Sequence, residues 1–100
     1  MRKGTTPTHI FKLPFNTDTL KSVMVIYAQN NVEVFKKETA DCVLEGDTVS
    51  VTLTQEETFK FNHDENVQIQ MRVLTAGGNA LASNIQKVAV RQCLNCEVLA

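Results

Sequence analysis

The clearest alternation of apolar and polar residues lies in the last third of the chain. From Val67 to Val73 every second residue is apolar, and the residues between them are Gln68, Gln70 and Arg72. A period of two is typical of a β-strand with one face on a core and the other toward solvent. Gly77-Gly78 follows, and glycine readily adopts the positive φ angles of tight hairpin turns. The pattern predicts a long β-hairpin over residues 66–93.

In the return strand of this hairpin, the apolar residues change from one face of the strand to the other part-way along. Its first apolar positions share one face with Ser83: they are Leu81 and Ile85. Val88 and Val90 fall on the opposite face of a regular strand. A β-bulge near Gln86-Lys87 would return these two valines to the core, because a bulge inserts one extra residue into a strand. The alternative is a true switch of face.

Earlier segments carry strand patterns as well: they span 8–15, 20–29, 32–38, 41–44 and 48–53. The first contains Pro14, which cannot donate a ladder hydrogen bond, so it predicts an edge strand. The second is apolar on both faces and β-branched at its centre, which predicts a strand in the middle of a sheet. The inward face of 32–38 is ambiguous, because Val34 and Phe35 lie on opposite faces.

A short helical signal lies between the segment 48–53 and the long hairpin. Thr54 and Glu57 have the spacing of a capping box, in which each side chain binds the other residue's backbone N–H. The sequence therefore predicts a single helical turn over residues 55–59. We expect it to carry the chain across one end of the structure, with Phe59 or Phe61 filling the core.

Together these segments predict an all-β fold: a single immunoglobulin-like antiparallel β-sandwich of about seven strands, with one short helical turn near 55–59. The chain contains no tryptophan, so the likeness is to the architecture and not to antibody domains. We expect a flexible N-terminal tail at residues 1–6, the sandwich domain at 7–93 and a C-terminal tail at 94–100.

Composition narrows the functions worth considering. The 100 residues are 43% hydrophobic and 21% charged, with a formal net charge of −1. This balance provides no field that would attract nucleic acid or an anionic membrane surface, so neither is an expected partner. No apolar run has the length of a signal-peptide core or a membrane-spanning helix. Three cysteines, an odd number, suit a reducing compartment. These features predict a cytoplasmic protein.

The only string that matches a reactive or metal-binding motif is Cys93-Leu94-Asn95-Cys96. Zinc needs four ligands, and the remaining candidates, among them Cys42, His9 and His63, are scattered singly. A thioredoxin-type pair begins at a helix N-terminus, whereas this pair follows a strand. We therefore expect no metal, no cofactor and no catalytic residue. A small zinc or thiol protein that uses Cys93, Cys96 and Cys42 is the less favoured alternative.

Several strings resemble those of small immunoglobulin-like β-sandwich proteins of unknown function encoded in phages and prophage-like elements of gut Firmicutes. They are GTTPTH at 4–9, LPF at 13–15, YAQ at 27–29, LTQEET at 53–58 and SNI at 83–85. The likeness runs over most of the chain. It implies a virion or assembly component and carries no catalytic residue. The proteins that this chain resembles end in apolar and acidic residues instead of Cys93 and Cys96, so the resemblance assigns no role to the pair.

The resulting hypothesis is a non-enzymatic structural or assembly protein, encoded by a phage or prophage, that acts through protein–protein contacts. The expected interaction residues are Thr8, Ile10 and Lys12 on an edge strand, the polar row Gln68, Gln70 and Arg72, and the tail residues Leu94, Val98 and Leu99. Its expected partners are other virion or assembly proteins, or further copies of itself. Its expected location is the bacterial host cytoplasm or a virus particle. A carbohydrate- or cell-surface-binding accessory module is the alternative, although the chain offers only one tyrosine, Tyr27, for a sugar-stacking platform.

Overall fold

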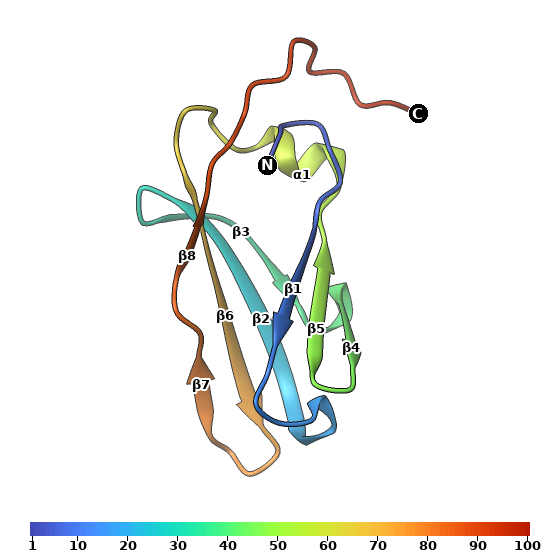
Figure 1. The fold of residues 1–100 in the computed structure, drawn as a ribbon, viewed down its shortest axis with the longest axis vertical. Coiled ribbons are helices and arrows are strands. Elements are labelled where there is room, and N and C mark those ends of the chain that lie inside the picture. The colour runs from blue at the N-terminus through green and yellow to red at the C-terminus, as the bar shows by residue number, and fades with distance from the viewer.

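A computed structural model describes residues 1–100 as two packed antiparallel sheets with one short helix (Figure 1). The strands are β1 (Thr8–Lys12), β2 (Leu20–Gln29), β3 (Val32–Glu38), β4 (Cys42–Glu45), β5 (Thr48–Thr52), β6 (Val67–Thr75), β7 (Ala80–Ala82) and β8 (Gln86–Val88). The helix α1 spans Gln55–Phe59, and two 3-10 turns lie at Thr17–Thr19 and Thr39–Asp41. The predicted all-β sandwich with a helical turn at 55–59 is confirmed.

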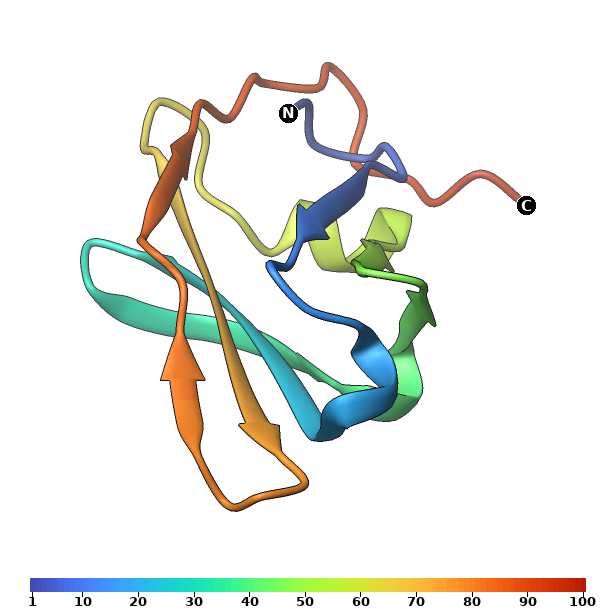
Figure 2. The same cartoon turned by 60° about the horizontal axis from the view of Figure 1, so that its bottom comes forward.

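The strand order gives the sandwich its topology. One sheet has the order β1-β5-β4, and the other has the order β3-β2-β6-β7 with β8 also paired to β6. Figure 2 shows the two sheets as separate layers joined at one end by α1. With β1 taken as strand B of an immunoglobulin domain, the sheets have the orders B-E-D and C′-C-F-G. Strand A, which would precede B, has no counterpart, so β1 forms one edge of its sheet.

The central strand of the larger sheet is β2, as its two-faced apolar pattern predicted. It pairs with both β3 and β6 along most of its length. The β2–β3 turn consists of Asn30 and Asn31, whose φ angles are +53° and +64°. Asparagine tolerates this left-handed region better than most residues, and two such residues in a row make a tight hairpin turn.

The core lies between the two sheets. Its fourteen buried apolar side chains are Phe11, Leu13, Val23, Val25, Tyr27, Val49, Val51, Leu53, Phe61, Val67, Ile69, Met71, Val73 and Val90. Of the two phenylalanines considered for the end of the sandwich, Phe61 is the one that fills the core, with 1% of its surface exposed. The Phe35 ring stacks on Tyr27 with centroids 5.0 Å apart and lies 5.3 Å from the ring of Phe61.

The inward face of β3 was ambiguous in the sequence, and a bulge explains why. The β2–β3 register shifts between Tyr27 and Ala28, so Val34 is an extra residue opposite them. Beyond the bulge, Phe35 and Lys37 point into the sandwich, and Lys37 is buried. A simple alternation cannot anticipate this arrangement, because the inward position holds a charged residue.

The final strand is broken, which makes eight strands instead of about seven. The register differs by one residue between the β6–β7 and β6–β8 pairs, and the break covers 83–85. The irregularity predicted near Gln86-Lys87 is therefore present, and it lies just before these residues, at 83–85. Ser83 accounts for this position, because its hydroxyl takes the place of a strand carbonyl and accepts the Met71 N–H at 3.0 Å. Val90 is returned to the core, while Ile85 is 54% exposed.

Two smaller expectations also need correction. The first strand ends at Lys12 and not at Phe15, because Pro14 has no N–H with which to continue the ladder. In the hairpin turn only Gly78 has a positive φ angle, so the turn needs one glycine and not two.

Candidate interaction site

The backbone of β1 has one side without a partner. Leu13 N–H donates to Asp47 O at 2.7 Å, and Leu53 N–H donates to Pro7 O at 3.0 Å. In an antiparallel ladder these bonds involve alternate residues, so the odd-numbered residues of β1 face β5. The N–H and C=O groups of the three even-numbered residues point away from the sheet: these are Thr8, Ile10 and Lys12. All three are exposed, and Ile10 is 68% exposed.

An apolar cleft opens beside this edge. It has a volume of about 500 Å³ and lies between the chain following β1 and the β6–β7 hairpin. Its apolar lining includes Phe11, Leu13, Phe15, Met71, Val73 and Leu81. Figure 1 shows β7 along the outer border of the larger sheet, with β6 and β2 between it and β1 in this view. The edge strands β1 and β7 belong to different sheets and are not paired with each other. The cleft is thus the open seam of a sandwich that lacks strand A.

The polar row of β6 lies elsewhere, on the outer face of the larger sheet. Gln68 exchanges two hydrogen bonds with Asn31, and the Gln70 amide donates to Ser83 O at 3.0 Å. Arg72 is exposed and makes no ion pair within the chain. Two of the three side chains are therefore held by the fold, and only the guanidinium is free.

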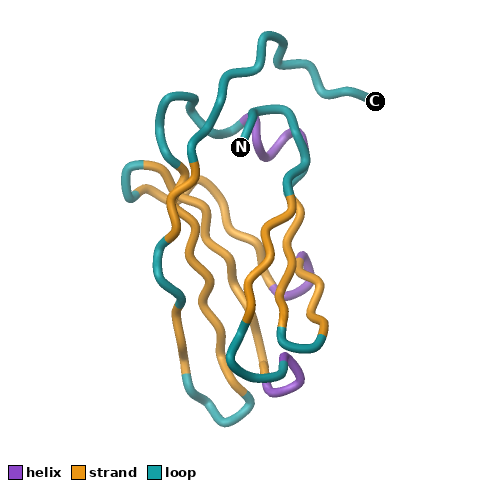
Figure 3. Tube along the Cα trace, viewed as in Figure 1, coloured by secondary structure: helices purple, strands orange, loops and turns teal.

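The C-terminal tail follows β8 as a loop, which Figure 3 shows crossing the α1 end of the molecule. Leu94 is fully exposed, Leu99 is 79% exposed and Val98 is 47% exposed. The tail is attached to α1 by two hydrogen bonds between the backbone of Leu99 and the side chain of Gln55. The predicted interaction residues thus occupy three separate surfaces and do not converge on one site.

Residues 1–6 also make contacts with the rest of the chain. The Met1 ammonium donates to Ala89 O at 2.6 Å, and Lys3 N–H donates to Arg91 O at 3.1 Å. The hydroxyl of buried Thr58 donates to Thr5 O. These bonds place the N-terminal segment beside the chain that follows β8, whereas its flexibility stays a prediction.

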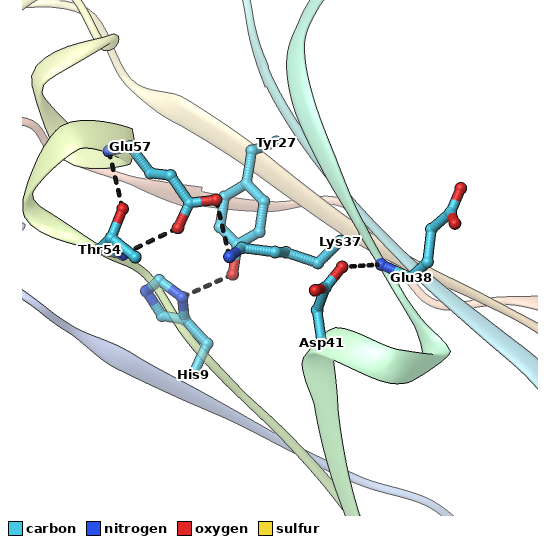
Figure 4. A network of polar contacts seen from close by, with 7 residues as sticks. All are labelled: His9, Tyr27, Lys37, Glu38, Asp41, Thr54 and Glu57. Atoms are coloured by element: carbon cyan, nitrogen blue, oxygen red, sulfur yellow. Dashed lines mark hydrogen bonds and ion pairs between the residues drawn. The ribbon is translucent and has the colours of Figure 1, made fainter.

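The polar residues inside the sandwich form a second candidate site (Figure 4). His9 Nδ1 and the Tyr27 hydroxyl are 2.8 Å apart, and Lys37 Nζ lies 2.7 Å from Glu57 Oε2. The other Glu57 oxygen accepts the Thr54 N–H at 2.8 Å, so the predicted capping box is present. These contacts connect β1, β2, β3 and α1 across the two sheets.

Two ionisable groups in or near this network have raised pKa values. Burial, together with the nearby charges of Cys42 and Glu57, raises the pKa of Tyr27. Burial and the Asp41 charge raise the pKa of the Cys42 thiol, which disfavours the nucleophilic thiolate. The His9–Tyr27 contact of this network joins β1 of the smaller sheet to β2 of the larger sheet.

The state of His9 leads to a prediction about pH. Burial, with a smaller effect of the N-terminal ammonium, lowers the pKa of His9 below its ordinary value of 6.5. The unfolded chain therefore takes up this proton at a higher pH than the folded chain. The free energy of unfolding should fall as the pH drops from about 7 to 5. In His9→Asn, denaturant titrations at several pH values should show a smaller fall in the free energy of unfolding. The same dependence on pH in the variant and the native protein would contradict this account.

The cysteines are spread over two regions. Cys42 lies in β4, while the Cys93 thiol donates to Asn95 O at 3.2 Å in the tail, where Cys96 is exposed. No group of three or more His, Cys, Asp or Glu side chains is placed to hold a metal ion.

Protein-family models, curated proteins and solved structures gave no match. No helix in the structure has the length and apolar character needed to cross a membrane.

Proposed function

We propose that this protein is a non-enzymatic assembly protein, encoded by a phage or prophage, that works by β-strand addition at the β1 edge. The observation that carries the proposal is the unpaired edge of β1 beside an apolar cleft. The phage or prophage setting rests on the sequence resemblance described above.

Strand addition uses both features of this site. An extended segment of a partner would exchange main-chain hydrogen bonds with Thr8, Ile10 and Lys12. Its alternate side chains would enter the cleft and contact residues such as Phe15 and Leu81. Backbone pairing supplies affinity in such complexes and side-chain pockets supply specificity. The segment expected in a partner is therefore an extended one with an apolar residue at every second position.

The exposed side chains favour a protein partner over a glycan. None of the six aromatic side chains is exposed, and Tyr27 is fully buried. The large apolar side chains on the surface are aliphatic: they are Ile10, Val32, Val43, Leu81, Ile85, Leu94, Val98 and Leu99. Aliphatic groups beside free backbone donors suit a peptide strand and provide no stacking platform for a sugar ring.

Substitutions at Ile10 test the proposal. In Ile10→Pro the lost N–H is one that points away from β5, so the β1–β5 ladder keeps its bonds. The matched control Ile10→Thr changes the side chain and keeps the N–H. Each variant is mixed with the proteins encoded next to this one, and the mass in solution is measured across a concentration series. We expect Ile10→Pro to weaken the complex about tenfold or more, through a lost hydrogen bond and a steric clash, and Ile10→Thr to weaken it far less.

Thermal melts of both variants establish that each is folded. If the native protein binds none of the proteins encoded beside it, the assembly role is wrong. If it binds one of them and folded Ile10→Pro binds equally well, the β1 edge is the wrong site.

A further inference from the structure

The outer face of the larger sheet carries an apolar stripe at its centre. Met24, Ile26 and Ala28 alternate with the buried residues of β2 and point away from the core, where they are only partly covered. Hollows of about 400 Å³ and about 170 Å³ lie on this sheet, toward the two ends of the stripe. Covering this stripe would remove its apolar surface from water, which is favourable.

The polar groups beside the stripe can be covered at little cost. The amides of Gln68 and Gln70 on β6 already have partners in Asn31 and Ser83. Burying a polar group is unfavourable chiefly when it loses its hydrogen bonds. These two amides would keep theirs under a docked surface.

The charges on this face are divided between its two sides. On the β3 side lie Glu33 and Glu38, with Lys36 3.6 Å from Glu38. On the β6–β8 side lie Arg72 and Lys87, and neither makes an ion pair within the chain. The register puts Glu38 and Arg72 opposite Met24 from either side, and Glu33 and Gln68 opposite Ala28. One side of the stripe is therefore net acidic and the other is basic.

From this division we infer that the outer face of the larger sheet binds a second copy of the chain, related by a two-fold axis parallel to β2. Such an axis places the β2 stripes of the two copies against each other and β3 of each copy over β6 of the other. Glu38 then faces Arg72 of the second copy, and Glu33 comes within reach of Lys87. A two-fold interface brings the same patch of both copies together. The acidic side of each copy therefore faces the basic side of the other, and each charge contact forms twice. The inference does not involve the β1 edge and is independent of the proposed function.

Charge exchange provides the test. An acidic variant combines Arg72→Glu with Lys87→Glu, and a basic variant combines Glu33→Lys with Glu38→Lys. All four residues are exposed, and thermal melts confirm folding. Sedimentation across a concentration series should show a dimer for the native protein. Each variant alone should dissociate about tenfold or more readily, because like charges then face each other. An equimolar mixture of the two should form the dimer again.

A matched control is Val43→Asp, which puts a charge on the outer face of the smaller sheet, where Val43 is 62% exposed. It should dimerise like the native protein, as should Ile10→Pro. The inference is wrong if the native protein remains a monomer, if either charge variant dimerises normally, or if the mixture stays monomeric. The acidic variant should still bind the proteins encoded beside this one, which separates failure here from failure of strand addition.

Discussion

Replacing Phe61 with alanine is expected to lower the free energy of unfolding by about 3–5 kcal/mol. The side chain is 1% exposed and packs against Phe35 and Tyr27, with ring centroids 5.3 Å and 6.2 Å away. It lies just after α1, where the chain crosses the end of the sandwich. Its removal leaves a cavity that the two neighbouring rings can only partly close. The loss of stability therefore includes both the transfer free energy of the ring and the cost of the cavity.

Phe59 is the matched control for this substitution. It has the same side chain two residues earlier, but it is only partly buried and lies against Gly4. We expect Phe59→Ala to cost less than half as much in urea titrations. Equal losses for the two variants would mean that Phe61 does not occupy the core.

The second large effect is expected at Glu57. In Glu57→Ala the ammonium of Lys37, whose side chain is 11% exposed, loses a partner 2.7 Å away, and the Thr54 N–H loses its acceptor. We expect the free energy of unfolding to fall by about 2–3 kcal/mol, because an unpaired charge stays buried and a helix cap is broken. The Glu57 side chain is 20% exposed, which keeps this loss below that of a fully buried pair. Lys37→Met removes the charge and keeps the apolar stem, so it should change stability by only about 1 kcal/mol.

The double variant decides whether the pair is coupled. Glu57→Ala combined with Lys37→Met should cost about 1–2 kcal/mol less than the sum of the single changes, because no charge is then left unpaired. Simple additivity in denaturant titrations would contradict the ion pair.

Acid provides a further check on Glu57. Burial alone would raise the pKa of this carboxyl, but the hydrogen bonds from Lys37 and from the Thr54 N–H outweigh it and lower the pKa below 4.5. The stability that Glu57 contributes is thus present above pH 4.5 and is lost as the pH falls through the lowered pKa. The difference between the native protein and Glu57→Gln should therefore shrink in strong acid.

The strands, the central position of β2 and the capping box could be predicted because each depends on local periodicity or spacing. The bulge at Val34 could not, since nothing in VEVFKKE marks the extra residue. The Lys37–Glu57 pair was also missed, because lysine on a strand normally indicates the solvent face. The change of parity in the return strand indicated the break, but its position depends on the Ser83 hydroxyl, which accepts the Met71 N–H and which the sequence pattern does not mark.

Some features of the candidate surfaces could likewise be predicted from the sequence, and others could not. The even-numbered residues of β1 were predicted as interaction residues, and the structure places them on the free edge. The cleft beside that edge was not predicted, because it arises from an absent strand and from residues 60 positions apart, such as Phe11 and Met71.

The most direct test of strand addition is amide hydrogen exchange at Ile10 and Lys12, with and without the bound protein encoded beside this one. In the free chain these two N–H groups point away from β5 and should exchange rapidly. In the complex both should become protected, while the amide of Val43 on the far strand of the same sheet keeps its rate. A stable complex in which Ile10 and Lys12 still exchange as in the free chain would contradict strand addition at β1.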